Sequence, residues 1–129
     1  MRRTVVLLAA IGAMLVLVSG VALGAFRYGS NGGENLYGTL RVDVIYGYGG
    51  SDRIYGFDGS DELRGGPGND AINAGFGNDR VFGGSGSDGL HVGSDEAMDY
   101  VNCGPGYDRV YLDDKDRYTT DCEVLTPID

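Results

Sequence analysis

Acidic side chains at a fixed spacing are the feature of this sequence most able to do chemistry. One acid recurs every nine residues, at Glu34, Asp43, Asp52, Asp61, Asp70, Asp79 and Asp88. A glycine stands two positions before each of the last five, at Gly50, Gly59, Gly68, Gly77 and Gly86. Carboxylates and backbone carbonyls are the ligands that hard divalent cations prefer. The repeating acids therefore indicate a series of cation sites.

The aliphatic residues share this frame and predict the elements that hold the acids in place. They stand two positions after the acids, at Leu36, Ile45, Ile54, Leu63, Ile72, Val81 and Leu90. Each unit divides into a glycine-rich turn of six residues and an extended stretch of three, such as residues 53–55, whose middle side chain points inward. Two units then form one coil of an all-β parallel β-roll, and alternate aliphatic residues line its two sheets.

Acids eighteen residues apart are expected to stack along one edge of this roll. The two stacks are Asp52, Asp70 and Asp88 on one edge, and Asp43, Asp61 and Asp79 on the other. Stacked strands lie about 4.8 Å apart, and carboxylates at that spacing repel one another unless a cation lies between them. Ca²⁺ suits such a site because it accepts about 6 to 8 oxygen ligands. Zn²⁺ prefers thiolate or His, of which the repeat region supplies only His91. The alternative is that these Asp residues only form solvated turns.

The unit G-G-P-G-N-D-A-I-N at residues 65–73 resembles the nonapeptide repeat of RTX, or hemolysin-type, calcium-binding proteins of the small secreted bacterial type. The resemblance is strongest over residues 47–91. It implies a right-handed β-solenoid that binds several Ca²⁺ ions. The implied ligands are the Asp carboxylates and the carbonyls of the flanking turns, at Asp43, Asp52, Asp61, Asp70, Asp79, Asp88, Gly50, Gly59, Gly68, Gly77 and Gly86.

Several positions depart from this repeat pattern. Tyr48 and Phe57 replace the second glycine of their units, and Ala74 replaces the first. Arg41 takes the fourth position in the unit that carries Asp43. That unit is therefore the one least suited to bind an ion.

Residues 1–24 have the order of a secretory signal helix. Arg2 and Arg3 precede an apolar run, and small residues such as Ala22 and Gly24 follow it. The alternative is an uncleaved membrane anchor, because no charge appears between Arg3 and Arg27. Both interpretations predict export, either as a secreted protein or as one held on the outer face of the cytoplasmic membrane.

The predicted roll, residues 29–93, is followed at residues 94–129 by degenerate repeats and a C-terminal cap. After His91 the frame shifts by two residues, and the pattern resumes around Val101 and Val110. Cys103 and Cys122 are the only cysteines, so an oxidising compartment predicts a disulfide that locks the cap. The alternative is a redox-active pair, although this spacing is far from Cys-x-x-Cys.

Charge and motifs argue against several functions. The 129 residues contain 10 Lys and Arg against 19 Asp and Glu, and a net charge of −9 disfavours a nucleic-acid partner. No serine-hydrolase elbow, zinc-protease motif or phosphate-binding loop occurs, so we expect no enzyme. The sequence predicts a secreted, non-catalytic module that folds on binding calcium. The alternative is a calcium-stabilised adhesion or interaction module with a cell-surface or protein partner, which touches the membrane only through an uncleaved N-terminal anchor.

Overall fold

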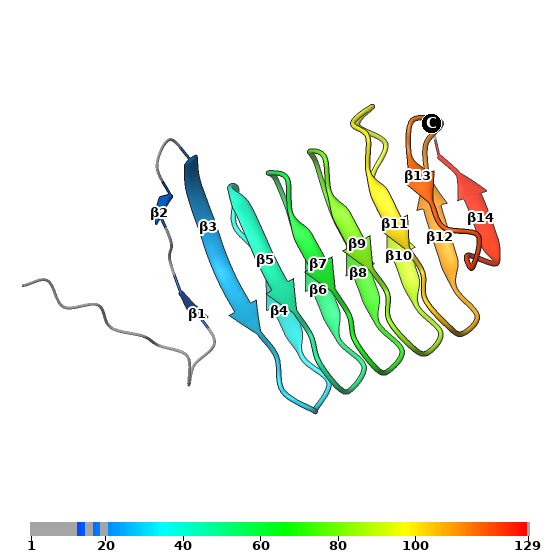
Figure 1. Ribbon diagram of the computed structural model, residues 1–129, viewed down its shortest axis with the longest axis horizontal. Coiled ribbons are helices and arrows are strands. Elements are labelled where there is room, and N and C mark those ends of the chain that lie inside the picture. The colour runs from blue at the N-terminus through cyan, green and yellow to red at the C-terminus, as the bar shows by residue number, and fades with distance from the viewer. Residues whose placement is uncertain (1–12, 15–16, 19–20, 129) are drawn as a thin grey trace, which may run out of the picture.

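The computed structural model describes residues 13–14, 17–18 and 21–128, and every regular element within them is a β-strand (Figure 1). The predicted all-β class is therefore confirmed for this part of the chain. The strands of the first half are β1 (Ala13–Met14), β2 (Leu17–Val18), β3 (Val21–Tyr28), β4 (Asn35–Tyr37), β5 (Val42–Tyr46), β6 (Arg53–Tyr55) and β7 (Glu62–Arg64). Those of the second half are β8 (Ala71–Asn73), β9 (Arg80–Phe82), β10 (Gly89–His91), β11 (Tyr100–Asn102), β12 (Arg109–Leu112), β13 (Arg117–Tyr118) and β14 (Val124–Pro127).

Alternate strands belong to two different sheets, as the nine-residue frame predicts. The odd-numbered strands from β3 to β13 form one parallel sheet, and the even-numbered strands from β4 to β14 form the other. Ile54 pairs with Ile72, and Leu63 of the opposite sheet pairs with Val81, so partners lie eighteen residues apart. The chain therefore winds as a parallel β-solenoid of about six coils (Figure 1).

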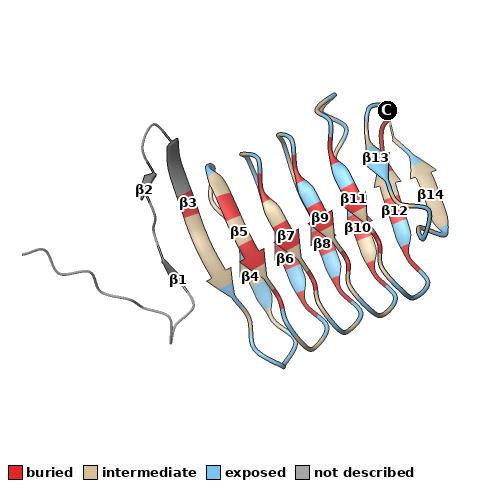
Figure 2. Ribbon diagram, viewed as in Figure 1, coloured by how far each residue is buried: buried red, intermediate tan, exposed pale blue. Residues whose placement is uncertain are grey.

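A thin apolar seam fills the space between the two sheets. Figure 2 marks the buried positions of the strands and turns in red. In the triplet strands β6 to β11 the middle side chain is buried and its neighbours face outward, as at Arg53, Ile54 and Tyr55. The predicted aliphatic column is part of this core, where Ile45, Ile54 and Leu63 are fully buried. The aliphatic column adds only two side chains per coil, and residues such as Ala74 and Val92 join it in the later coils, so the hydrophobic core stays narrow.

The turns depend on backbone conformations that glycine adopts easily. Gly68, at the fourth position of its unit, has a φ of 116°, and a Cβ there would overlap the carbonyl oxygen of Gly50 in the preceding coil. The second position is also left-handed, and there Tyr48 and Phe57 adopt φ values of 65° and 68°. These two departures from the repeat pattern therefore keep its turn conformation, at a cost in backbone strain that glycine avoids.

The last coils are held together by strand pairing and by a disulfide. Tyr100 pairs with Arg80 and Arg109 pairs with Gly89, so the spacing between partners rises to twenty residues, as the frame shift predicts. Cys103 and Cys122 form a disulfide with Cα atoms 5.3 Å apart. The predicted covalent lock on the C-terminal segment is confirmed.

The predicted signal helix lies largely outside the described residues. Of residues 1–24, the structure describes 13–14, 17–18 and 21–24, and β3 continues beyond them to pair with β5. Among the described residues no helix has the length and apolar character needed to cross a membrane.

Replacing Gly68 by alanine tests the packing of the turns. We expect Gly68→Ala to lower the free energy of unfolding by about 1 to 3 kcal/mol, because the residue has a positive φ and its Cβ would meet the backbone of the preceding coil. The matched control is Gly89→Ala, since a Cβ at that strand position meets nothing within 4 Å. Urea unfolding at saturating calcium measures both variants. Equal losses in the two would show that the turn geometry is not limiting.

Candidate metal centre

The acids of the repeat are buried in two stacks. The exposed fraction is at most 3% for each of Asp43, Asp52, Asp61, Asp70, Asp79 and Asp88. This burial contradicts the alternative in which the acids only form solvated turns. Ionised carboxylates are rarely buried unless a partner compensates their charge. Each stack therefore needs a source of positive charge or of protons.

Backbone hydrogen bonds connect the members of each stack. The N–H of Asp52 donates to Oδ1 of Asp70 at 2.8 Å, and the N–H of Asp70 donates to Oδ1 of Asp88 at 2.8 Å. On the other edge, the N–H of Asp61 donates to Oδ1 of Asp79 at 2.7 Å. The structure thus brings together acids eighteen residues apart, and one carboxylate oxygen of each is used to hold it in place.

The second oxygen of these carboxylates is buried and has no hydrogen-bond donor. This holds for Oδ2 of Asp52, Asp61, Asp70, Asp79 and Asp88. A buried polar atom without a partner is costly, by about 1 to 3 kcal/mol and more for a charged group. The same unpaired oxygen recurs in five successive units, so it is a regular feature of the turn. A cation bound at Oδ2 would satisfy it.

Glycine at the first position of the unit makes room for this oxygen. A Cβ at Gly65 would lie 2.5 Å from Oδ2 of Asp70 and 2.6 Å from the carbonyl oxygen of Gly83 in the next coil. The same crowding recurs at Gly47, beside Oδ2 of Asp52. A carboxylate oxygen and a carbonyl oxygen therefore face one small space that a side chain would fill. Oxygens arranged in this way fit the preference of Ca²⁺.

No side-chain cation compensates the stacks within the described part of the chain. The ion pairs there join Arg64 and Arg80 to Glu62, and Lys115 to Glu96, and none reaches a repeat Asp. Burial, together with the repulsion of neighbouring carboxylates, raises the pKa of Asp61 to about 8. Burial also raises the pKa of Asp79 to about 9. Without a bound cation, these sites would hold protons near neutral pH.

Asp43 differs from the other predicted ligands. Its Oδ2 accepts a hydrogen bond of 2.6 Å from the N–H of Thr39, and the Thr39 hydroxyl also donates to this carboxylate. The protein itself therefore satisfies the oxygen that is free in the later units. Asp43 belongs to the unit with Arg41, so this contact agrees with the prediction that this unit is the least suited to an ion.

Two buried acids outside the predicted set share the geometry of the stacks. Oδ1 of Asp99 accepts from the N–H of Asp79 at 2.7 Å, and Oδ1 of Asp108 accepts from the N–H of Asp88 at 2.8 Å. Oδ2 of both residues is buried without a partner. Sequence reasoning missed them because they lie beyond the frame shift, although each still precedes a buried Val by two positions.

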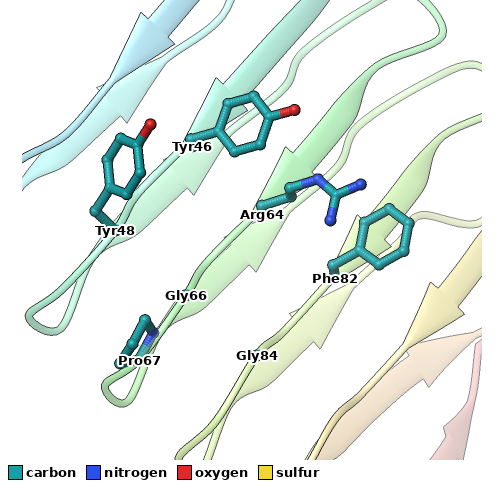
Figure 3. A pocket seen from close by; sticks show the side chains of 7 residues that line it. All are labelled: Tyr46, Tyr48, Arg64, Gly66, Pro67, Phe82 and Gly84. Atoms are coloured by element: carbon teal, nitrogen blue, oxygen red, sulfur yellow. The ribbon is translucent and has the colours of Figure 1, made fainter.

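The roll also has a shallow aromatic groove of about 210 Å³ on the outer face of the odd-strand sheet (Figure 3). Tyr46, Tyr48 and Phe82 line it with Pro67, and the guanidinium carbon of Arg64 lies 4.1 Å from the Phe82 ring centroid. Because Arg64 also pairs with Glu62 at 2.8 Å, its charge is already engaged. The groove offers a flat surface for stacking rather than a set of reactive groups.

The fold and its buried acids define a cation-binding parallel β-solenoid. Residues 28–56 and 55–90 match the RTX calcium-binding nonapeptide repeat, in a family model of four copies. Residues 28–90 of this chain are therefore RTX calcium-binding repeats. The resemblance seen in the sequence is confirmed, and with it the assignment of calcium binding to a β-roll.

One solved structure is similar to this chain. It is a subunit of the mannuronan C5-epimerase from Azotobacter vinelandii, solved in solution, with 26% identity and a TM-score of 0.40. The similarity covers 65% of this chain and 47% of that subunit, so the chain spans about half of its length. No curated protein sequence matches the chain significantly. The matched family is defined by a calcium-binding repeat that is typical of exported proteins, and it is generally not enzymatic.

The raised pKa values predict how the metal-free fold responds to pH. The folded pKa is about 6 for Asp70 and about 8 for Asp88, whereas an unfolded Asp titrates near about 3.9. The folded chain therefore binds protons more tightly, and this contribution to stability is complete below about pH 4 and is lost as the pH rises through these folded values. With calcium chelated, we expect more β signal in far-ultraviolet circular dichroism at pH 4 than at pH 7.5.

The control for this experiment is the same pH series at saturating calcium. There the β signal should be retained at pH 7.5, since the cation replaces the protons at the buried oxygens. A metal-free chain with equal structure at pH 4 and pH 7.5 would contradict the titration assigned to the stacks.

Proposed function

We propose that this chain is an exported, non-catalytic calcium-binding module whose β-roll folds when Ca²⁺ binds between stacked turns. The observation that carries the proposal is the buried Oδ2 atom without a donor in Asp52, Asp61, Asp70, Asp79 and Asp88. The family match supports Ca²⁺ as the ion. These five carboxylates are the proposed side-chain ligands. Asp43 is the weakest of the predicted ligands because Thr39 already occupies its free oxygen.

The proposed carbonyl ligands come from the turns that carry Gly50, Gly59, Gly68, Gly77 and Gly86. Among the described residues, no backbone N–H donates to the carbonyl oxygens of these glycines. The carbonyl of Gly50 also points toward Gly68 in the next coil. Carbonyls free of hydrogen bonds and directed along the stack are available to a cation held between two turns.

Calcium would act here as a folding ligand. The apolar seam is thin, and the chain has a net charge of −9 that favours expansion unless it is neutralised. A ligand that binds only the folded state adds its binding free energy to stability. Extracellular calcium modules bind at about 10⁻⁴ to 10⁻³ M, a range that would tie folding to export. We therefore propose a chain that stays largely unfolded before it reaches calcium outside the cell.

Several finer features of the molecule belong to this proposal. Export would depend on the predicted signal segment, residues 1–24, either cleaved or kept as an anchor. The roll would extend over residues 29–93, and residues 94–129 would close it as a cap. The sense of winding would be right-handed, because connections between parallel strands in one sheet are right-handed in about 98% of cases.

Exposed aromatic stacks favour a second function, a calcium-stabilised interaction module. Tyr37 and Tyr55 stack with centroids 5.2 Å apart on the even-strand sheet, and Tyr28 and Tyr46 stack at 5.7 Å on the odd-strand sheet. Tyr37 is 49% exposed. If these faces bind a cell-surface or protein partner, that binding should require calcium and should fall in a Tyr37→Ser variant that retains its calcium midpoint.

The variant Asp70→Asn tests the proposed ligand set. Asp70 lies between Asp52 and Asp88 in one stack, so it would serve two sites. We expect its calcium midpoint, followed by far-ultraviolet circular dichroism, to rise at least about tenfold, which corresponds to about 1.4 kcal/mol. Mg²⁺ should not replace Ca²⁺ in the unaltered chain, because its smaller octahedral shell retains water.

The matched control is Asp114→Asn, which removes one exposed turn acid that belongs to neither stack. Its midpoint should stay close to that of the unaltered chain, because it removes no buried oxygen. An unchanged midpoint in Asp70→Asn, or equal shifts in both variants, would reject the buried carboxylates as ligands.

A further inference from the structure

We propose that the metal-binding stacks continue into the C-terminal segment, where Asp99 and Asp108 hold two further divalent cations. This inference rests on the proposed calcium function of the repeats. It goes beyond that function because both residues lie outside residues 28–90, the part of the chain that matches the calcium-binding repeat. It also means that bound metal, together with the disulfide, would hold the cap against the roll.

Burial and hydrogen bonding carry the assignment. Asp99 is 1% exposed and Asp108 is fully buried, and Oδ2 of each lacks a hydrogen-bond donor. Their Oδ1 atoms accept from the N–H groups of Asp79 and Asp88, the last acids of the two matched stacks. The local geometry of a repeat site is therefore reproduced although the spacing has risen from eighteen to twenty residues. The two additional residues lie in the turns, and the acids remain aligned in their stacks.

The stacks end one step later. The N–H of Asp99 donates to Oδ1 of Asp116 at 3.0 Å, and the second oxygen of Asp116 accepts from the N–H of Asp113 at 2.8 Å. On the other edge, the N–H of Asp108 donates to Oε2 of Glu123 at 2.8 Å. Asp116 thus uses both oxygens within the protein, as Asp43 does at the opposite end. Asp99 and Asp108 are the last stacked acids with a free buried oxygen among the described residues.

The electrostatic surroundings of both residues favour a cation. The acids Asp95, Asp113 and Asp116 lie near Asp99, and Glu123 and Asp121 lie near Asp108. The ammonium of Lys115 pairs with Glu96 at 3.3 Å rather than with these buried acids. Since like charges at close range destabilise the fold, a divalent cation at each site would relieve the repulsion.

A second group in the cap, Cys103, Asp121 and Cys122, brings sulfur and carboxylate oxygen atoms within 4.8 Å of one another. It carries no metal proposal because both sulfur atoms are bonded in the disulfide. That bond joins the segment after β11 to the chain just before Glu123. The cap would therefore be fastened twice, by the covalent bond and by ions at Asp99 and Asp108.

The test is the number of calcium ions bound per chain at saturation, measured by equilibrium dialysis of the full chain. We expect Asp99→Asn and Asp108→Asn each to lose one ion and the double variant to lose two. The control variant, Asp114→Asn, removes an exposed acid of the same segment and should keep every ion. Asp61→Asn provides the reference for a site within the matched repeats.

The outcomes separate this inference from the proposed function. An unchanged ion count in the double variant, with a reduced count in Asp61→Asn, would overturn the cap sites and leave the function of the repeats intact. An unchanged count in all variants would overturn the proposed function itself. Counts are compared only among variants whose circular dichroism in calcium equals that of the unaltered chain.

A second measurement covers the case in which the Asn variants do not fold. Tyrosine-sensitised luminescence of bound Tb³⁺, a probe for calcium sites, is measured in Tyr100→Phe and Tyr107→Phe, which keep every carboxylate. These tyrosines adjoin Asp99 and Asp108 in sequence and are 38% and 58% exposed, so the substitutions disturb little packing. A larger loss of emission than in Tyr37→Phe supports ions in the cap. Equal emission in all three variants would reject them.

Discussion

The structure depends on one buried carboxylate in each turn. One of its oxygens accepts a hydrogen bond from the backbone of the preceding coil, as Oδ1 of Asp70 does from Asp52, and this bond fixes the rise from coil to coil. The other oxygen is enclosed without a donor. The glycine at the first position follows from this arrangement, because at Gly65 a side chain would occupy the space that Oδ2 of Asp70 needs. Turn sequence, coil spacing and cation binding are therefore consequences of a single interaction.

The stability of the fold therefore has two main contributions, the burial of apolar side chains and the charge of the buried acids. The aliphatic column contributes two core side chains to each coil, such as Ile72 and Val81. Each turn, by contrast, buries an acid that protein cations do not neutralise in the described chain. The acids would oppose folding at neutral pH, because desolvation of a carboxylate is costly. Binding Ca²⁺ reverses the sign of their contribution. A fold built in this way responds to the calcium concentration of its compartment.

The two ends of the described roll show how such a stack is closed. At the N-terminal end, Thr39 donates to Asp43 and replaces a cation with hydrogen bonds. At the C-terminal end, Asp116 accepts from two backbone N–H groups, and the Cys103–Cys122 disulfide ties the last coil to the roll. Solenoids need atypical terminal units because the last repeat has no further neighbour to cover it. Here the ends differ from the interior chiefly in how the carboxylates are satisfied.

The period, the two sheets and the alignment of the acids can be predicted from the amino-acid sequence alone, because a strict nine-residue repeat leaves few ways to align the glycine, acid and aliphatic columns. Which carboxylate oxygens remain free depends on contacts between coils, since the hydrogen bond between Asp79 and Asp99 joins residues that are twenty positions apart across a frame shift. The contact of Thr39 with Asp43 was likewise invisible in the repeat pattern. The free carboxylate oxygens and the Thr39–Asp43 contact both depend on the packing of neighbouring coils, which the local sequence does not determine.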